Sequence, residues 1–447
     1  MHTGTTRTAF NATYITGICF IAALGGYLFG FDFAVIAGGL PFLQKQFGLD
    51  AYWEGFVTGV LALGAILGCL VAGDLSNRFG RKPALLTAAC LFGLSSLAMA
   101  LAPGRDVFIA ARGLAGVAVG MASMLSPLYI AELAPPVYRG RLIAINQLTI
   151  VLGIFFTNLI NYSLRNQGDD AWRWMFGLGV APAALFFGGL LWLPESPRWL
   201  IKKGRTDAAK AILSKIGGAA YAQSTITDVG QPGRSDKKVR YRELLNRLYL
   251  PAVLTGIALA VFQQFCGINT VFNYTPLIFK SMGASPDDQL FQTVLIGAVN
   301  FLFTVLAILL VDRLGRKPLM LAGAGGLCVL YLLIAWLLQQ QSPSVSWLLL
   351  SAIGVYALSL APVTWVLMAE IFPGKVRVQA ITVAGMFLWL AYFTLVFTFP
   401  VLFETFKENT FYLYAGVCAL GFLLVWRAVR ETKGKSLEEI DNLPVSH

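Results

Sequence analysis

The sequence predicts an all-α membrane protein with twelve transmembrane helices, and three observations lead to this prediction. Of the 447 residues, 57% are hydrophobic and only 13% are charged, whereas a soluble domain carries about 25% charged residues. The mean hydropathy is +0.69, and the apolar residues fall into long runs. Twelve runs approach the roughly 20 residues that a helix needs to cross the hydrocarbon core. The segments must cross as helices, because an open strand edge leaves backbone groups unsatisfied in lipid.

The predicted helices follow one another through short connections, except for one long polar segment after the sixth. They begin near Tyr14, Trp53, Pro83, Val107, Arg141, Arg173, Leu250, Leu290, Pro318, Ser346, Gln379 and Thr410. The polar N-terminus leads directly into the first helix, which lacks a small-residue cleavage pattern. We therefore expect no cleavable signal peptide.

The basic residues predict the orientation in the membrane. Most of the 34 Lys and Arg residues fall in segments that lie on one side when the N-terminus is cytoplasmic. Since short cytoplasmic loops carry an excess of Lys and Arg, we expect a multi-pass protein with both termini in the cytoplasm. The same asymmetry accounts for the net charge of +11, so we expect the lipid bilayer, and no nucleic acid, as a partner.

Cysteine and histidine usage argues against an enzyme. The six cysteines lie in apolar segments without a CxxC pair, and both histidines lie at the chain ends. Cysteines in such positions are typical of small buried apolar residues. Because the sequence offers no nucleophile–base pair or metal-ligand cluster, we expect no enzymatic activity, no metal site and no cofactor.

The chain contains an internal repeat, which predicts two six-helix bundles. RFGRKP (78–83) recurs as RLGRKP (313–318), and Glu132 with Arg139 recurs as Glu370 with Arg377. An even number of helices gives both copies the same orientation, as in parallel-repeat transporters. We expect bundles at 1–200 and 249–430, joined by a cytoplasmic linker with short helices at 201–248 and followed by a cytoplasmic tail at 431–447.

Charged residues at the repeated motifs predict conformational ion pairs at the cytoplasmic face. We interpret them as a clamp that holds the inner ends together when the protein opens outward and breaks when it opens inward. Topology alone would explain the basic residues, but not their repeated acidic partners. The residues are Asp74, Arg78, Arg81, Glu132, Arg139, Glu195, Asp312, Arg313, Arg316, Glu370, Arg377 and Glu431.

Two isolated charges predict a proton-coupling pair. Asp32 is the only charge within the membrane part of the first predicted helix, and Arg112 is the only one within that of the fourth. Each lies about six residues, roughly 9 Å, from the outer end of its helix. Intramembrane charges face the bundle interior and pair. Because arginine stays protonated, Asp32 would accept the proton and Arg112 would tune it. The alternative is a static ion pair.

Amide side chains near the membrane midplane predict a solute site. Uncharged groups that both donate and accept hydrogen bonds suit a polyhydroxyl ligand, and Trp365 and Trp389 add apolar faces for a pyranose ring. The alternative is that these amides only hold helices together, a common use of Gln and Asn in membranes. The amide residues are Gln147, Gln263, Gln264, Asn269, Asn273 and Asn300.

Seven motifs in order carry a family resemblance. They are GDLSNRFGRK (73–82), PLYIAELAPPVYRGRL (127–142), PESPRWL (194–200), QQFCGINTVFNYTP (263–276), VDRLGRKP (311–318), APVTWVLMAEIFP (361–373) and ETKGKSLEEI (431–440). Nearly the whole chain resembles the sugar-porter branch of the major facilitator superfamily. The resemblance implies the major facilitator fold and alternating access around a central sugar site. The compact length and short outer loops are typical of bacterial members, which implies a bacterial inner membrane, and one chain suffices as a functional monomer.

The resemblance also implies roles for individual residues. Symporters of this family resemble the chain in carrying Asp at position 32, whereas facilitators usually carry Asn. The pattern departs at Asn273, where Tyr is common, at Leu388, where an amide usually precedes Trp389, and at Ala361, which replaces Gly. Sugar contacts fall at Gln147, Gln263, Gln264, Asn269, Asn300 and Trp365, and apolar wall positions at Phe29, Ile150 and Ile154.

These observations together predict proton-coupled symport of a monosaccharide, with the proton as the coupling ion. The departures leave glucose, galactose, xylose, arabinose, fucose-like and cyclitol ligands open, because one missing hydrogen-bond partner can shift preference by orders of magnitude. The alternatives are a facilitative sugar uniporter, a cyclitol transporter and a non-transporting sugar sensor. The short segment after the last helix disfavours the sensor.

Overall fold

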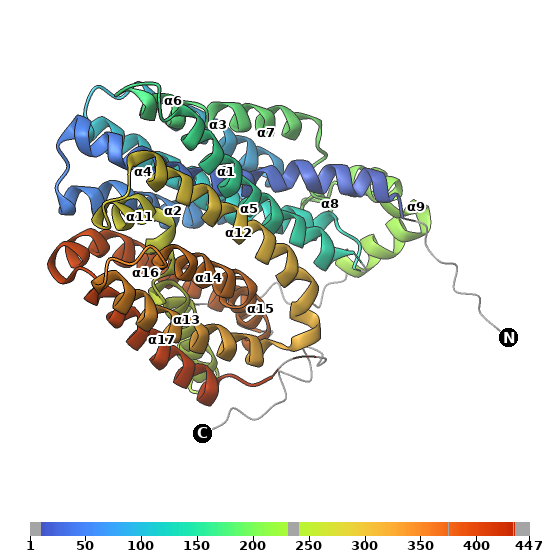
Figure 1. The fold of residues 1–447 in the computed structure, drawn as a ribbon. Coiled ribbons are helices and arrows are strands. Elements are labelled where there is room, and N and C mark those ends of the chain that lie inside the picture. Colours follow the sequence, from blue (N-terminus) through green and yellow to red (C-terminus); the bar gives the residue numbers. More distant parts are fainter. Residues whose placement is uncertain (1–9, 137, 231–240, 374, 432, 434–447) are drawn as a thin grey trace.

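The computed structural model describes residues 10–136, 138–230, 241–373, 375–431 and 433 (Figure 1). Twelve spans in these ranges are long and apolar enough to cross a membrane. The described residues form helices and turns without a strand, so the predicted all-α class is confirmed. Of the predicted tail, all residues except Glu431 and Lys433 lie outside the described ranges.

The twelve spans form two bundles of six, with three short elements between them (Figure 1). The first bundle contains α1 (Ala12–Phe47), α2 (Ala51–Phe79), α3 (Arg81–Ala100), α4 (Arg105–Leu133), α5 (Arg139–Leu164), α6 (Ala171–Gly177) and α7 (Val180–Trp192). The second contains α10 (Leu250–Phe265), α11 (Ile268–Ser281), α12 (Pro286–Leu314), α13 (Arg316–Gln339), α14 (Val345–Leu358), α15 (Leu360–Ile371), α16 (Arg377–Phe406) and α17 (Asn409–Ala428). Between them lie α8 (Pro197–Lys202), α9 (Thr206–Gly230) and η1 (Tyr241–Leu245).

Three of the spans are each divided into two helices: α6 with α7, α10 with α11, and α14 with α15. The break between α10 and α11 lies at Gly267, whose φ is +86°. A Cβ at this position would lie 2.6 Å from the ring of Tyr414, so glycine is required both by the backbone conformation and by the space. The break leaves polar residues on both sides of it in the interior of the second bundle.

The molecule has two ends, which we name by the elements there. The linker end carries α8, α9 and η1, and the far end carries the connection from α1 to α2 (Figure 1). The two bundles pack together mainly through α2 with α16, α5 with α12 and α1 with α11.

Close contacts between the bundles lie in the far halves of these helices. A Cβ on Gly55 of α2 would lie 2.1 Å from the carbonyl oxygen of Phe397 on α16. Asn158 Nδ2 on α5 donates to the carbonyl oxygen of Thr293 on α12 over 2.8 Å. Among the described residues, α4 and α5 do not pack extensively against α15 or α16. The bundles are therefore closed against one another at the far end.

Candidate functional site

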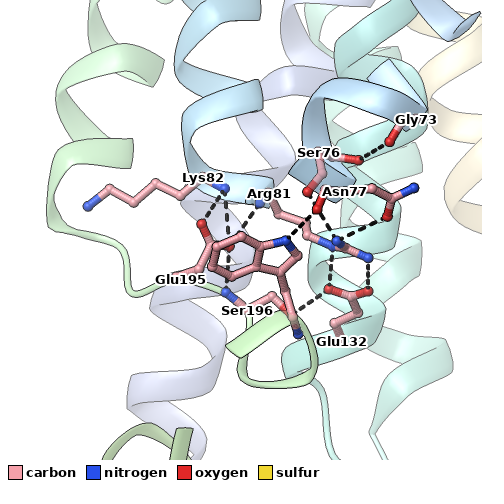
Figure 2. A network of polar contacts seen from close by, with 9 residues as sticks. Gly73, Ser76, Asn77, Arg81, Lys82, Glu132, Glu195 and Ser196 are labelled. Carbon is pink, nitrogen blue, oxygen red and sulfur yellow. Dashed lines mark hydrogen bonds and ion pairs between the residues drawn. The ribbon is translucent and has the colours of Figure 1, made fainter. Parts of the chain in front are cut away.

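A network of charged groups at the linker end fastens the first bundle (Figure 2). Arg81, at the start of α3, donates from Nε and Nη2 to the two carboxylate oxygens of Glu132 on α4, each over 2.9 Å. This bidentate pair is almost buried, with side chains 10% and 9% exposed. The Ser196 hydroxyl also donates to Glu132, so the carboxylate has partners from α3 and from the start of α8.

Glu195 lies beside this pair and accepts hydrogen bonds from backbone N–H groups. The donors are Arg81 at 2.9 Å, Ser196 at 2.7 Å and Lys82 at 3.3 Å (Figure 2). Burial raises the pKa of the Glu195 carboxyl, and these backbone hydrogen bonds act in the opposite direction. Gly80 makes room for the carboxylate, because a Cβ there would lie 2.2 Å from Glu195 Oε2.

The second bundle repeats this arrangement. Glu431 accepts from the backbone N–H groups of Arg316 at 3.1 Å and Lys317 at 3.0 Å, as Glu195 does in the first bundle. Arg316 Nη2 lies 3.5 Å from Glu370 Oε1. Gly315 makes room for Glu431, whose Oε2 would lie 2.7 Å from a Cβ there. The repeated sequence motif therefore folds into the same local structure twice.

Two ion pairs of the predicted clamp residues each lie within one bundle. The Arg81–Glu132 pair joins α3 to α4 and the Arg316–Glu370 pair joins α13 to α15. The reason is local: each arginine starts the helix beside the one that carries its acidic partner. Whether the cytoplasmic ion pairs break when the protein opens inward stays a prediction.

The remaining residues of the predicted clamp lie in different surroundings at the linker end. Asp74 and Arg78 are exposed, and no ion pair in the described ranges joins them. Arg139 is half-buried and its Nε has no hydrogen-bond acceptor, because Glu132 pairs with Arg81 instead. Arg377 Nε donates to the carbonyl oxygen of Phe372 over 2.9 Å. Arg313 is exposed, and the side chain of Asp312 lies outside the described part.

Neutralising Glu132 should destabilise the first bundle. In Glu132→Gln, Arg81 keeps its charge in an almost buried position without a carboxylate partner. Removing one partner of a buried pair costs about 3–5 kcal/mol. We expect thermal unfolding of the purified protein at a clearly lower temperature, with Asp74→Asn, an exposed acid on α2, as the neutral control. Equal melting temperatures for both variants would contradict this role.

Asp32 and Arg112 meet in the interior of the first bundle. Arg112 Nη1 on α4 lies 3.5 Å from Asp32 Oδ1 on α1, and both side chains are 1% exposed. Within the described residues, neither carboxylate oxygen of Asp32 has a hydrogen-bond donor. The Arg112 guanidinium also lies over the ring of Phe176, 5.9 Å from its centroid. The Asp32 charge therefore depends on a single ion pair in a medium where an uncompensated charge is costly.

A chain of hydrogen bonds runs through the interior of the second bundle at the α10–α11 break. Gln263 Nε2 donates to the Tyr356 hydroxyl over 2.6 Å. Gln264 Nε2 donates to Gln263 Oε1, and Asn269 Nδ2 donates to Gln264 Oε1, each over 2.5 Å. Asn273 Nδ2 donates to the carbonyl oxygen of Asn269 over 2.7 Å.

The same amide group of Asn273 reaches the hydroxyl of Tyr392 on α16 over 3.2 Å. The chain thus begins and ends at a tyrosine, Tyr356 on α14 and Tyr392 on α16. The structure brings together four of the predicted amides, and each of them is buried. Their donors and acceptors partly satisfy one another, so a ligand here exchanges existing hydrogen bonds for its own.

The predicted apolar wall residues lie in or against the first bundle, and one of them contacts the second bundle. The rings of Phe29 on α1 and Trp389 on α16 lie 5.7 Å apart. Ile150 lies on α5 at a close crossing with α1, because a Cβ on Gly30 would lie 2.0 Å from the Ile150 carbonyl oxygen. Ile154, one turn further along α5, is buried.

Three predicted sugar positions stand apart from the amide chain. Asn300 on α12 is buried, Gln147 on α5 is half-buried, and Trp365 on α15 is 48% exposed. No hydrogen bond or ring contact within the described part of the chain joins these three residues to the amide chain. Their place in a sugar site therefore stays a prediction.

Sequence reasoning missed Tyr356 and Tyr392. Both are tyrosines in apolar helices and both are buried, and a buried tyrosine hydroxyl needs a polar partner. That signal was present in the sequence. The partner was not, because α14 and α16 meet the α10–α11 break only in the folded bundle.

Comparisons with known proteins agree with this architecture. Residues 18–443 match the family model "Sugar (and other) transporter". The D-xylose-proton symporter of Escherichia coli is 37% identical, over 98% of this chain and 97% of that protein. The arabinose-proton symporter of Bacillus subtilis is 37% identical, over 94% of this chain and 93% of that protein.

A solved structure has the same fold. The xylose transporter of Escherichia coli in an inward-open conformation gives a TM-score of 0.84 at 35% identity, over 96% of this chain and 99% of that one. The family and the curated relatives are transporters and not enzymes. The chain therefore belongs to the sugar transporter family, in the sugar-porter branch of the major facilitator superfamily.

Proposed function

We propose that this protein is a proton-coupled symporter of a monosaccharide, a hexose or a pentose. The observation that carries the proposal is the buried Asp32–Arg112 pair, at 3.5 Å and with side chains 1% exposed. A buried ion pair is a poor device for stability alone, whereas a lone carboxylate that loses its only partner is a suitable proton acceptor. Further support comes from two relatives, which are known as proton symporters of D-xylose and of arabinose.

The proton step follows from the isolation of Asp32. While Arg112 is beside it, the carboxylate is compensated and stays ionised. When a rearrangement of α4 against α1 moves the guanidinium away, the bare carboxylate takes up a proton, because burial penalises its charged form. Arg112 keeps its own proton throughout. Binding of the proton and the approach of Arg112 therefore exclude one another, and that exclusion links protonation to helix movement.

The sugar is held by the amide chain and the facing aromatic rings. Gln263, Gln264, Asn269 and Asn273 offer donors and acceptors in the second bundle, and Phe29 with Trp389 provides an apolar contact across the bundles. Asn300, Gln147, Trp365, Ile150 and Ile154 complete the proposed wall. These wall residues include no Lys or Arg that would attract an anionic solute. We therefore propose a neutral polyol such as a pyranose as the ligand.

We further propose a location and orientation. The linker end faces the cytoplasm, because basic residues concentrate in the segments of that end. Both termini then lie in the cytoplasm of a bacterial cell, the protein acts as a monomer in the inner membrane, and the closed far end makes this conformation inward-facing. The likeness to an inward-open relative supports this assignment.

The proposal is tested with the purified protein in proteoliposomes. A panel of radiolabelled D-xylose, L-arabinose, D-glucose and D-galactose is offered with and without an inward proton gradient. We expect accumulation of at least one sugar above its external concentration only with the gradient, and alkalinisation of the medium when that sugar is added. Uptake that merely equilibrates, without a change in external pH, would identify a uniporter and refute the proposal.

A further inference from the structure

Tyr392 connects the proposed sugar site to the Asp32–Arg112 pair, and we propose that it is the positioning residue that couples the two. The inference rests on the proposed function, which it deepens by naming the contact through which a bound sugar influences the proton site. Tyr392 lies on α16 of the second bundle, is 3% exposed, and has a different neighbour on each side.

On one side Tyr392 contacts the last residue of the amide chain. Asn273 Nδ2 lies 3.2 Å from the Tyr392 hydroxyl, and the same hydroxyl lies 3.4 Å from Asn273 Oδ1. The hydroxyl can accept from the amide or donate to it. Asn273 is fully buried, so any sugar hydroxyl that binds its amide competes directly with Tyr392. Occupancy of the sugar site thus changes the hydrogen bonding of this phenol.

On the other side Tyr392 contacts the helix that carries Asp32. Its ring lies 5.7 Å from the ring of Phe33, tilted by 39°, and Phe33 follows Asp32 directly on α1. A displaced phenol would therefore move the Phe33 ring and, with it, the segment of α1 that carries Asp32.

The titratable surroundings of Tyr392 are few. Helix α1 contributes Asp32 and α4 contributes Arg112. Helix α11 contributes Tyr274, whose hydroxyl donates to the carbonyl oxygen of Val396 over 2.8 Å. Helix α2 contributes Glu54, whose charge reaches Tyr274. A proton-linked effect of Tyr392 would therefore act through α1 on the buried Asp32–Arg112 pair.

The departures from the family pattern fit this assignment. Asn273 stands where an aromatic tyrosine is common, and Leu388 stands where an amide usually lies on the eleventh span. In this chain the phenol comes from Tyr392, one helical turn beyond Leu388. The hydrogen-bonding group of α16 therefore lies nearer the far end than position 388 does. Asp32 likewise lies nearer the far end than Phe29, the residue of α1 that contacts Trp389.

The test compares two tyrosine hydroxyls of the same network. Tyr392→Phe removes the hydroxyl at the α16 end, and Tyr356→Phe removes the one at the α14 end, which contacts Gln263. Uptake of the four-sugar panel is measured in proteoliposomes as gradient-driven accumulation, as downhill exchange and as a function of external pH. Loss of one hydrogen bond changes affinity by about tenfold.

We expect Tyr392→Phe to retain downhill exchange but to lose about tenfold in accumulation, and to shift the pH of half-maximal uptake. Tyr356→Phe should raise KM by a similar factor and leave the pH profile and the accumulation ratio at saturating sugar unchanged. Wild-type accumulation and pH dependence in Tyr392→Phe would overturn the inference, as would equal pH shifts in both variants. If Tyr392→Phe does not fold, Phe33→Leu, which removes the ring that Tyr392 contacts on α1, must produce the same uncoupling.

The two proposals fail differently. If the wild-type protein shows no gradient-driven accumulation, the proposed symport fails and this inference falls with it. If the wild-type protein accumulates sugar and Tyr392→Phe does so equally, symport stands and only the role of Tyr392 is refuted.

Discussion

Asp32→Asn is expected to abolish uphill accumulation while downhill exchange of the sugar continues. Asparagine keeps the size and shape of the side chain but cannot take up and release a proton. One proton moving through 100 mV supplies about 2.3 kcal/mol, which corresponds to roughly a fiftyfold gradient of a neutral solute at about 1.36 kcal/mol per decade. The variant should therefore reduce the accumulation ratio from tens to one, measured with radiolabelled sugar in proteoliposomes under an inward proton gradient.

Asp106→Asn is a suitable control for this experiment. Asp106 is also an aspartate of the first bundle with an arginine partner, Arg105 at 3.2 Å, but its side chain is 86% exposed. We expect this variant to accumulate sugar like the wild-type protein. Uphill uptake at the wild-type level in Asp32→Asn would show that the buried pair is structural and would remove the main support for symport.

Gly55→Leu is expected to block transport without unfolding either bundle. A Cβ at Gly55 would lie 2.1 Å from the carbonyl oxygen of Phe397, a backbone atom of the other bundle that cannot rotate away. With leucine at position 55, α2 and α16 could no longer approach one another closely enough to close the far end. Overpacking of this kind costs about 1–3 kcal/mol, so the closed far end should become about 10- to 100-fold less populated and uptake should fall accordingly.

The measurement for Gly55→Leu combines uptake with hydrogen exchange. Peptides from the far halves of α2 and α16 should exchange faster than in the wild-type protein, because the population opens at that end. Gly416→Leu on α17 serves as the control, since nothing lies within 4 Å of a Cβ there and the residue is exposed. Wild-type uptake in Gly55→Leu, or an equal loss in Gly416→Leu, would refute the idea that this glycine permits closure.

Ion pairs within a bundle and contacts between the bundles have different roles in this structure. The Arg81–Glu132 and Arg316–Glu370 pairs hold neighbouring helices within one bundle, so the joined ends of α3 and α4, and of α13 and α15, can move together. The contacts between bundles are made by small residues, by aromatic rings such as Phe29 with Trp389, and by polar groups such as Asn158 with the Thr293 carbonyl. Such contacts can form and break as the bundles rock, as alternating access requires.

Much of this protein follows from its sequence alone. Hydrophobic length fixes the number of spans, because each must cross the same hydrocarbon thickness. The fixed rise of a helix converts position into depth, which places Asp32 and Arg112 at the same level and explains why their pairing could be predicted. The repeated motifs predict two equivalent bundles, because identical local sequences form identical caps and ion pairs.

Tertiary structure decided what depth and repetition do not specify. Which charges meet at the linker end depends on helix rotation and neighbourhood, so Glu132 pairs with Arg81 and leaves Arg139 aside. Sequence placed Gln263, Gln264 and Asn273 in one predicted helix, but the tyrosines that complete their hydrogen bonds come from helices almost 100 or more residues later in the chain. Contacts between distant helices depend on tilt and packing, which are properties of the assembled bundles and not of any one span.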